Sequence, residues 1–138
     1  MPPSSDFDRL LAAIGKLKLP AYTDSKALLH WYLFNVFRLD EIQAQDAICD
    51  SSNDKGIDGI SVDDDTEEVF LFQATYTNDQ VRTLGDVDLK GFVSSAEWFK
   101  DPETVQKLLA SGASPDLKAL VIRLDVVTKL QQSYRVRL

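Results

Sequence analysis

A β-hairpin pattern between Asn53 and Tyr76 constrains this chain more than any other feature. Two runs with strand patterning, Ile57 to Val62 and Val69 to Thr75, flank an acidic segment rich in turn-forming residues. An antiparallel pair with its loop centred between Asp65 and Thr66 accounts for this pattern. We expect the rest of the chain to support that hairpin.

The expected register brings polar side chains together. Asp58 falls opposite Gln73, and directly opposed residues share a face of the sheet with Cβ atoms about 5 Å apart. The second strand is apolar on both alternating sets, which is typical of a strand covered on both faces. Gln73 is the polar exception, and a buried polar group needs a partner or a function. Asp58 and Gln73, beside Thr75, are therefore a candidate ligand pair.

The segments D-K-G-I-D, ending at Asp58, and Q-A-T-Y, beginning at Gln73, resemble motifs of the PD-(D/E)XK nuclease superfamily. The chain is similar, from Leu39 to Phe99, to the amino-terminal domain of abortive-infection phage-resistance (AIPR-type) proteins. In that domain a helix leads into D-x-G-I-D, and a hydrophobic strand ends in Q-x-K-Y. The resemblance implies an α/β fold, a restriction-endonuclease-like mixed sheet flanked by helices. It also implies a metal-dependent nuclease that acts on DNA or RNA in phage defence.

The resemblance implies a Mg²⁺ or Mn²⁺ site. Asp58 would be the central ligand, Gln73 an auxiliary ligand, and Glu41 the extra acid that a preceding helix can supply in these nucleases. Magnesium prefers oxygen ligands, commonly one or two carboxylates with water and substrate phosphate. Such a metal activates water and stabilises charge on the scissile phosphate.

Thr75 stands where the family has a lysine, and threonine cannot supply that lysine's positive charge. Lys90, on the helix expected after the hairpin, and Lys55, in the turn before Asp58, are candidate replacements. Each can equally face solvent. Glu41 can equally be a first-turn acid that interacts with the helix dipole.

Two other functions stay open beside the nuclease. The chain can be a nuclease-like fold that has lost its chemistry and binds nucleic acid or protein. It can also be a small α/β interaction domain in which Asp58 hydrogen-bonds the backbone at a strand edge and Gly59 permits a bulge. If the chain is a nuclease, we expect its catalytic residues to be Asp58, Gln73 and Lys90.

Composition excludes several other classes. The formal net charge of −7 disfavours a nonspecific nucleic-acid binder, because phosphates are contacted by Lys and Arg. Much of the acidity lies between Asp63 and Glu68, which predicts a solvated hairpin tip. Cys49, the single cysteine, excludes an internal disulfide and is expected to be a packed core thiol. His30, the single histidine, is expected to be a satisfied helix residue, so serine and cysteine triads lose their base.

Apolar periodicity and capping residues predict the other elements. Helices are expected at Asp6 to Lys18, after Thr23 or Asp24, at Glu41 to Cys49 behind an Asp40 cap, at Asp86 to Phe99, and from Asp101 to Gly112. The apolar run Leu117 to Val127 predicts a third buried strand. Residues 1–138 are expected to form a single nuclease-like domain.

The two ends of the chain carry further expectations. The start lacks the basic and apolar regions of a signal peptide, and no apolar run approaches the ~20 residues of a membrane span. We therefore expect a cytoplasmic protein without membrane contact. The chain ends within Q-Q-S-Y-R-V-R-L, which is patterned like an amphipathic strand. This ending suggests an amino-terminal fragment with further domains downstream.

Overall fold

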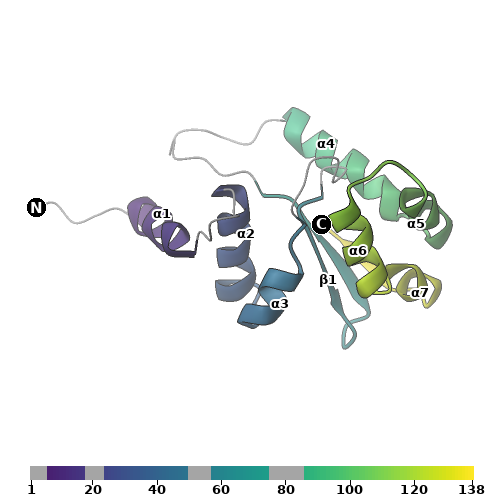
Figure 1. Ribbon diagram of the computed structural model, residues 1–138, viewed down its shortest axis with the longest axis horizontal. Coiled ribbons are helices and arrows are strands. Elements are labelled where there is room, and N and C mark those ends of the chain that lie inside the picture. Colours follow the sequence, from purple (N-terminus) through teal and green to yellow (C-terminus); the bar gives the residue numbers. More distant parts are fainter. Residues whose placement is uncertain (1–5, 18–23, 50–56, 75–85) are drawn as a thin grey trace, which may run out of the picture. The chain divides into compact units, whose positions relative to one another are not determined.

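The computed structural model describes residues 6–17, 24–49, 57–74 and 86–138, whose order can be followed by colour in Figure 1. Its elements are α1 (Asp6–Leu17), α2 (Asp24–Asn35), α3 (Glu41–Asp46), β1 (Gly59–Asp63), β2 (Glu68–Phe72), α4 (Asp86–Ala96), the 3-10 helix η1 (Glu97–Phe99), α5 (Pro102–Leu109), α6 (Pro115–Arg123), α7 (Val126–Gln131) and β3 (Arg135–Arg137). The helices α1 to α3 belong to one compact unit. The three strands and α4 to α7 belong to a second.

The N-terminal unit is helical throughout its elements, as predicted. Helix α2 contacts both α1 and α3. Helix α3 begins with a reciprocal cap, in which the Gln43 N–H donates to Asp40 Oδ1 (2.8 Å) and the Asp40 N–H donates to Gln43 Oε1 (3.1 Å). This capping box satisfies two backbone donors at the helix start. The predicted role of Asp40 as a cap is confirmed.

Helix α3 is shorter than predicted. It ends at Asp46 rather than Cys49, because Ile48 forms an antiparallel bridge with Gly59. The sheet therefore takes the backbone groups that a longer helix would have used. The side chain of Ile42 on this helix is 71% exposed, although it is apolar.

The hairpin has the predicted register. Strands β1 and β2 are antiparallel, with Ile60 opposite Leu71 and Val62 opposite Val69. Strand β3 pairs in parallel with β2 and sets Val136 beside Val69, so the sheet is mixed and has the order β1-β2-β3. The predicted strand at the end of the sequence is thus confirmed.

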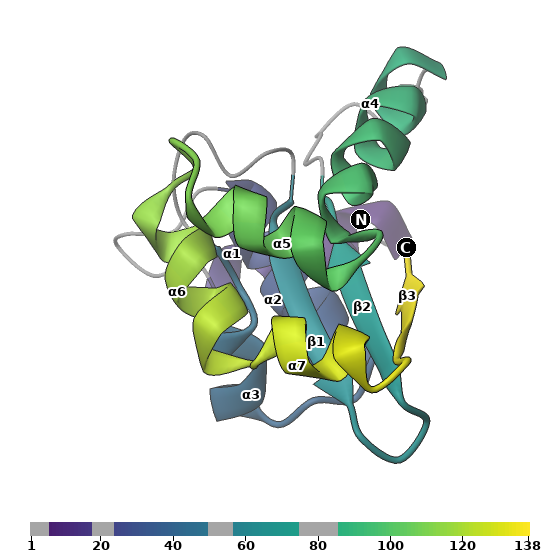
Figure 2. The same ribbon diagram turned by 90° about the vertical axis from the view of Figure 1, so that its right-hand side faces the viewer.

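Helices α5, α6 and α7 lie along one face of the hairpin, a layering seen in both Figure 1 and Figure 2. The core between them includes Ile60, Leu71, Phe99, Leu108 and Leu120, each at most 2% exposed. Full burial of an aliphatic or aromatic side chain contributes about 1.5 to 3 kcal/mol. This face therefore holds the second unit together.

The prediction of a buried strand at 117–127 was wrong. Helices α6 and α7 occupy this run, and they are separated at Asp125, whose φ is 55°. Ser114 caps α6 by accepting a hydrogen bond from the Leu117 N–H (3.1 Å). Leu117, Leu120 and Val121 are buried at helical spacing. A short apolar run has no periodicity that separates a buried strand from a buried helix.

The helices are short. The longest, α1 and α2, have 12 residues each, whereas a membrane-spanning helix needs about 20. Along the described residues, no helix has the length and apolar character needed to cross a bilayer.

Alanine substitutions in α6 distinguish a helix from the strand that the sequence suggested. Leu120→Ala should lower the free energy of unfolding by about 2 to 5 kcal/mol, because it removes a core side chain. Ile122→Ala should change it by less than about 0.5 kcal/mol, because Ile122 is 66% exposed. Urea denaturation followed by circular dichroism measures both. Equal losses at the two positions would contradict the helix, since residues 120 and 122 share a face only in a strand.

Candidate functional site at the open end of the hairpin

The backbone of Asp58 is held from both sides at the open end of the hairpin. Its N–H donates to the Phe72 carbonyl (2.8 Å), and its carbonyl accepts from the Cys49 N–H (2.8 Å). The Ile60 N–H donates to the Ala47 carbonyl (2.9 Å), so residues 47–49 flank the start of β1. The backbone of this candidate ligand is therefore fixed on the sheet.

The chain leaves the regular ladder at Asp58. Phe72 is the ladder partner of Gly59, yet its carbonyl also accepts the N–H of Asp58. Two consecutive residues of one strand thus contact one residue of the other, which is the arrangement of a β-bulge. A bulge redirects the side chain that it carries. The ladder ends at the pair Gly59 and Phe72, so the expected pair of Asp58 with Gln73 is not part of it.

The predicted site residues differ in their burial. Asp58 is half-buried, whereas Gln73 is exposed, so the prediction of Gln73 as a buried polar exception was wrong. The strand that precedes Gln73 has one fully buried face, while Phe70 and Phe72 on the other face are only half-buried. Lys90 is exposed on α4. Lys55 and Thr75 lie outside the described residues.

Glu41 lies in the N-terminal unit, next to a buried histidine. His30 is 1% exposed, and its Nε2 is 3.0 Å from Oε1 of Glu41. The two atoms are close enough for an ion pair when the imidazole is protonated. Glu41 thus joins α3 to α2, and Asp58 and Gln73 belong to the other unit.

Of the three predicted metal ligands, Glu41 belongs to one unit and Asp58 and Gln73 belong to the other. In residues 6–17, 24–49, 57–74 and 86–138, no group of three or more His, Cys, Asp or Glu side chains is placed to hold a metal ion. Asp58 is a described carboxylate at the hairpin's open end whose backbone is hydrogen-bonded on both sides. Any metal held there would need water or substrate oxygens to complete its coordination.

Substitutions of Glu41 test whether its role is structural. Glu41→Ala should lower the free energy of unfolding by about 1 kcal/mol, because His30 loses a partner at a buried position. Glu41→Gln should lose less, since the amide oxygen can still accept from the imidazole. Thermal and urea unfolding of both variants measure the difference. Identical stability of Glu41→Ala and the parent chain would contradict a structural role.

The acidic hairpin tip is attached to the C-terminal segment. The Tyr134 hydroxyl donates to Asp64 Oδ1 (2.8 Å), and Lys129 Nζ is 3.1 Å from the same oxygen. Lys129 also lies 5.4 Å from the centre of the Tyr134 ring. The hydrogen bond from Tyr134, followed by that from Lys129, lowers the pKa of Asp64. The acidic tip is therefore exposed to solvent, as expected, and its Asp64 also contacts the C-terminal segment.

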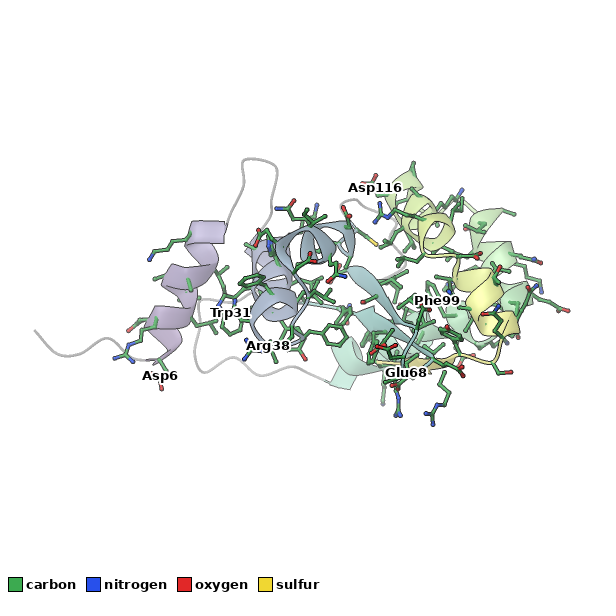
Figure 3. The ribbon with its side chains drawn as sticks, turned by 90° about the horizontal axis from the view of Figure 1, so that it is seen from below. Asp6, Trp31, Arg38, Glu68, Phe99 and Asp116 are labelled. Atoms are coloured by element: carbon green, nitrogen blue, oxygen red, sulfur yellow. The ribbon has the colours of Figure 1, made fainter. Side chains whose placement is uncertain are left out.

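A second acid of the hairpin anchors β3. Arg137 pairs through Nε with Oε2 of Glu68, and this hydrogen bond is the largest cause that lowers the pKa of Glu68. Figure 3 shows Glu68 beside the C-terminal strand, in agreement with its ladder partner Arg135. Opposite charges thus accompany the backbone pairing of β2 and β3.

The anchoring of Asp64 predicts a pH dependence. Because its pKa is lowered in the folded chain, its contribution to stability is complete above the ordinary value of 3.8 and is lost as the pH falls through the lowered value. Asp64→Asn should therefore destabilise the protein at pH 7, and the difference from the parent should shrink as the pH falls below about 4. Unfolding curves between pH 2 and pH 7 measure it.

Asp65→Asn is the matched control for this pH series, because Asp65 is an exposed acid of the same turn. The stability of Asp65→Asn should match that of the parent chain at every pH. A constant effect of Asp64→Asn over the whole range would contradict the assignment.

The sequence contained weak signals for the contacts that were missed. The lone histidine lies on an apolar helix and Glu41 opens the next helix, but nothing in the sequence sets their distance. The acidic tip and the basic Arg135-Val136-Arg137 segment are complementary in charge. That complementarity does not set the direction or register of a strand, so it does not predict the parallel pairing with β2.

Comparison of the chain with protein-family models, with curated proteins and with solved structures found no significant match.

Proposed function

We propose that this chain is a metal-dependent phosphodiesterase domain that hydrolyses DNA or RNA. The observation that carries the proposal is the half-buried Asp58 at a β-bulge, fixed between Phe72 and Cys49 at the open end of a hairpin. Bulges are over-represented beside active sites, where they redirect a side chain. The short segments D-K-G-I-D and Q-A-T-Y, which resemble motifs of phage-defence nucleases, suggest the same function in the cytoplasm.

The chemistry assigned to the site is simple. Asp58 would hold Mg²⁺ or Mn²⁺, with the exposed Gln73 as an auxiliary oxygen ligand and substrate phosphate completing the shell. Such an ion, when bound, would supply activation of water and stabilisation of charge on the phosphate. Lys90 on α4 is the proposed replacement for the positive charge that Thr75 lacks. Glu41 has a competing interaction with His30 and is the weakest of the proposed ligands.

Metal titration of Asp58 variants tests the proposal. Mn²⁺ should bind the parent chain at one saturable site by calorimetry, at neutral pH and low salt. Asp58→Asn should weaken binding by about 10- to 100-fold or more, since it removes the carboxylate charge. It should also abolish Mg²⁺-dependent cleavage of DNA and RNA.

Asp116→Asn is the control for the metal titration, because Asp116 is an exposed acid on α6, at the periphery of the view in Figure 3. It should leave Mn²⁺ binding unchanged. Cleavage that persists in Asp58→Asn, with that variant folded, would overturn the proposal.

A second candidate function is a nuclease-like fold without catalysis that binds nucleic acid or protein. Thr75 in the lysine position and the exposure of Gln73 favour it. The same titration separates the two candidates. Absence of Mn²⁺ binding by the folded parent chain, together with retained binding of an oligonucleotide, would support this second function.

A further inference from the structure

A pocket in the C-terminal unit lies apart from Asp58 in the sequence and is formed by the turn before α5, the end of α7 and β3. Its volume is about 600 Å³, which falls in the range of small-molecule sites. The residues that line it are Lys100, Asp101, Pro102, Leu130, Tyr134, Arg135, Val136 and Arg137. A cavity of this size accommodates one nucleotide.

The charge of the pocket is opposite to that of the chain. Lys100, Arg135 and Arg137 line it, although the formal net charge of the chain is −7. The one lining acid, Asp101, caps α5: its Oδ1 accepts from both the N–H and the hydroxyl of Thr104, each at 2.7 Å. These two hydrogen bonds are the largest causes that lower the pKa of Asp101, so it remains an anion, and the three cations outnumber it among the lining residues.

Two of the three cations are available to an anion. Arg137 pairs with Glu68, whereas Lys100 and Arg135 are exposed and take part in no ion pair within the described ranges. Arginine and lysine are the side chains that bind phosphate through charge-assisted hydrogen bonds. Lys100 and Arg135 are thus the anion-binding candidates.

The pocket also has a fixed apolar wall. Pro102, Leu130 and Val136 contribute apolar surface, and Tyr134 adds an aromatic ring. The ring is held by the hydrogen bond from its hydroxyl to Asp64 and by Lys129, 5.4 Å from its centre. A wall whose position is already set costs little to order when a planar ligand binds.

We propose that this pocket binds a nucleotide, with its phosphate on Lys100 and Arg135 and its base against Tyr134 and Leu130. The nucleotide can be free or can be the phosphorylated end of a strand. The choice of a nucleotide as the occupant rests on the proposed function. Its binding requires no metal at Asp58.

Nucleotide binding is measured by calorimetry on the full chain in EDTA at low salt, with adenosine 5′-monophosphate and adenosine as probes. The monophosphate should bind at a saturable site. Adenosine, which lacks the phosphate, should bind at least about tenfold more weakly. Lys100→Gln and Arg135→Gln should each weaken monophosphate binding about tenfold, as expected for a lost charged contact. Lys107 is an exposed lysine of α5 outside the pocket, so Lys107→Gln should leave binding of the monophosphate unchanged.

A hexanucleotide with a 5′-phosphate, compared with its 5′-hydroxyl form, distinguishes the two sources. Tighter binding of the phosphorylated strand than of the monophosphate supports a strand end, and the reverse order supports a free nucleotide. Equal binding of adenosine and its monophosphate would overturn the proposal. No binding of any probe, or no effect of Lys100→Gln and Arg135→Gln in folded variants, would also overturn it.

Asp58→Asn separates this inference from the proposed nuclease. Because the assay contains EDTA, Asp58→Asn should bind the monophosphate as the parent chain does. Absence of Mn²⁺ binding by the parent chain, or cleavage that persists in Asp58→Asn, would refute the nuclease, and retained monophosphate binding would then leave the pocket assignment in place.

Discussion

The antiparallel pairing of β1 with β2 is the interaction on which the C-terminal unit depends. It brings Ile60, Val69 and Leu71 onto one face, where α5 to α7 cover them almost completely. Each strand is also paired on its outer side, β1 with residues 47–49 and β2 with β3. The pairing therefore satisfies the backbone and creates the apolar surface at the same time. Loss of this register would turn the buried side chains toward solvent.

At the tip of the hairpin, contacts of charged side chains add to the backbone pairing of β2 with β3. A parallel strand of three residues is a weak element by itself, and β3 is held beside β2 by Arg137 with Glu68 and by Tyr134 with Asp64. The same contacts fix the ring of Tyr134 at the wall of the basic pocket. The acidic tip thus serves the structure, and Arg137, the partner of Glu68, also lines the proposed nucleotide pocket.

The candidate site was only partly predictable from sequence. The loop centre gave the register of the hairpin, because a two-residue periodicity and an acidic turn leave few alternatives. The sequence suggested a bulge here only in the interaction-domain alternative, through Gly59, because the bulge depends on residues 47–49 and β2 both bonding to the same short segment. The pairing of Glu41 with His30 was missed for a similar reason. Contacts between helices depend on how they pack rather than on spacing along the chain.

The sequence by itself determined most helices, the hairpin and its register, and the burial of Cys49, because caps, turn residues and periodicity are local signals. Only the tertiary structure decided that the apolar run 117–127 is helical, since its core contacts and not its composition select the conformation. It also decided that Gln73 is exposed and that the basic C-terminal strand lies beside the acidic hairpin. The physical reason is that burial and long-range charge pairing depend on which elements pack together, and no local pattern encodes that choice.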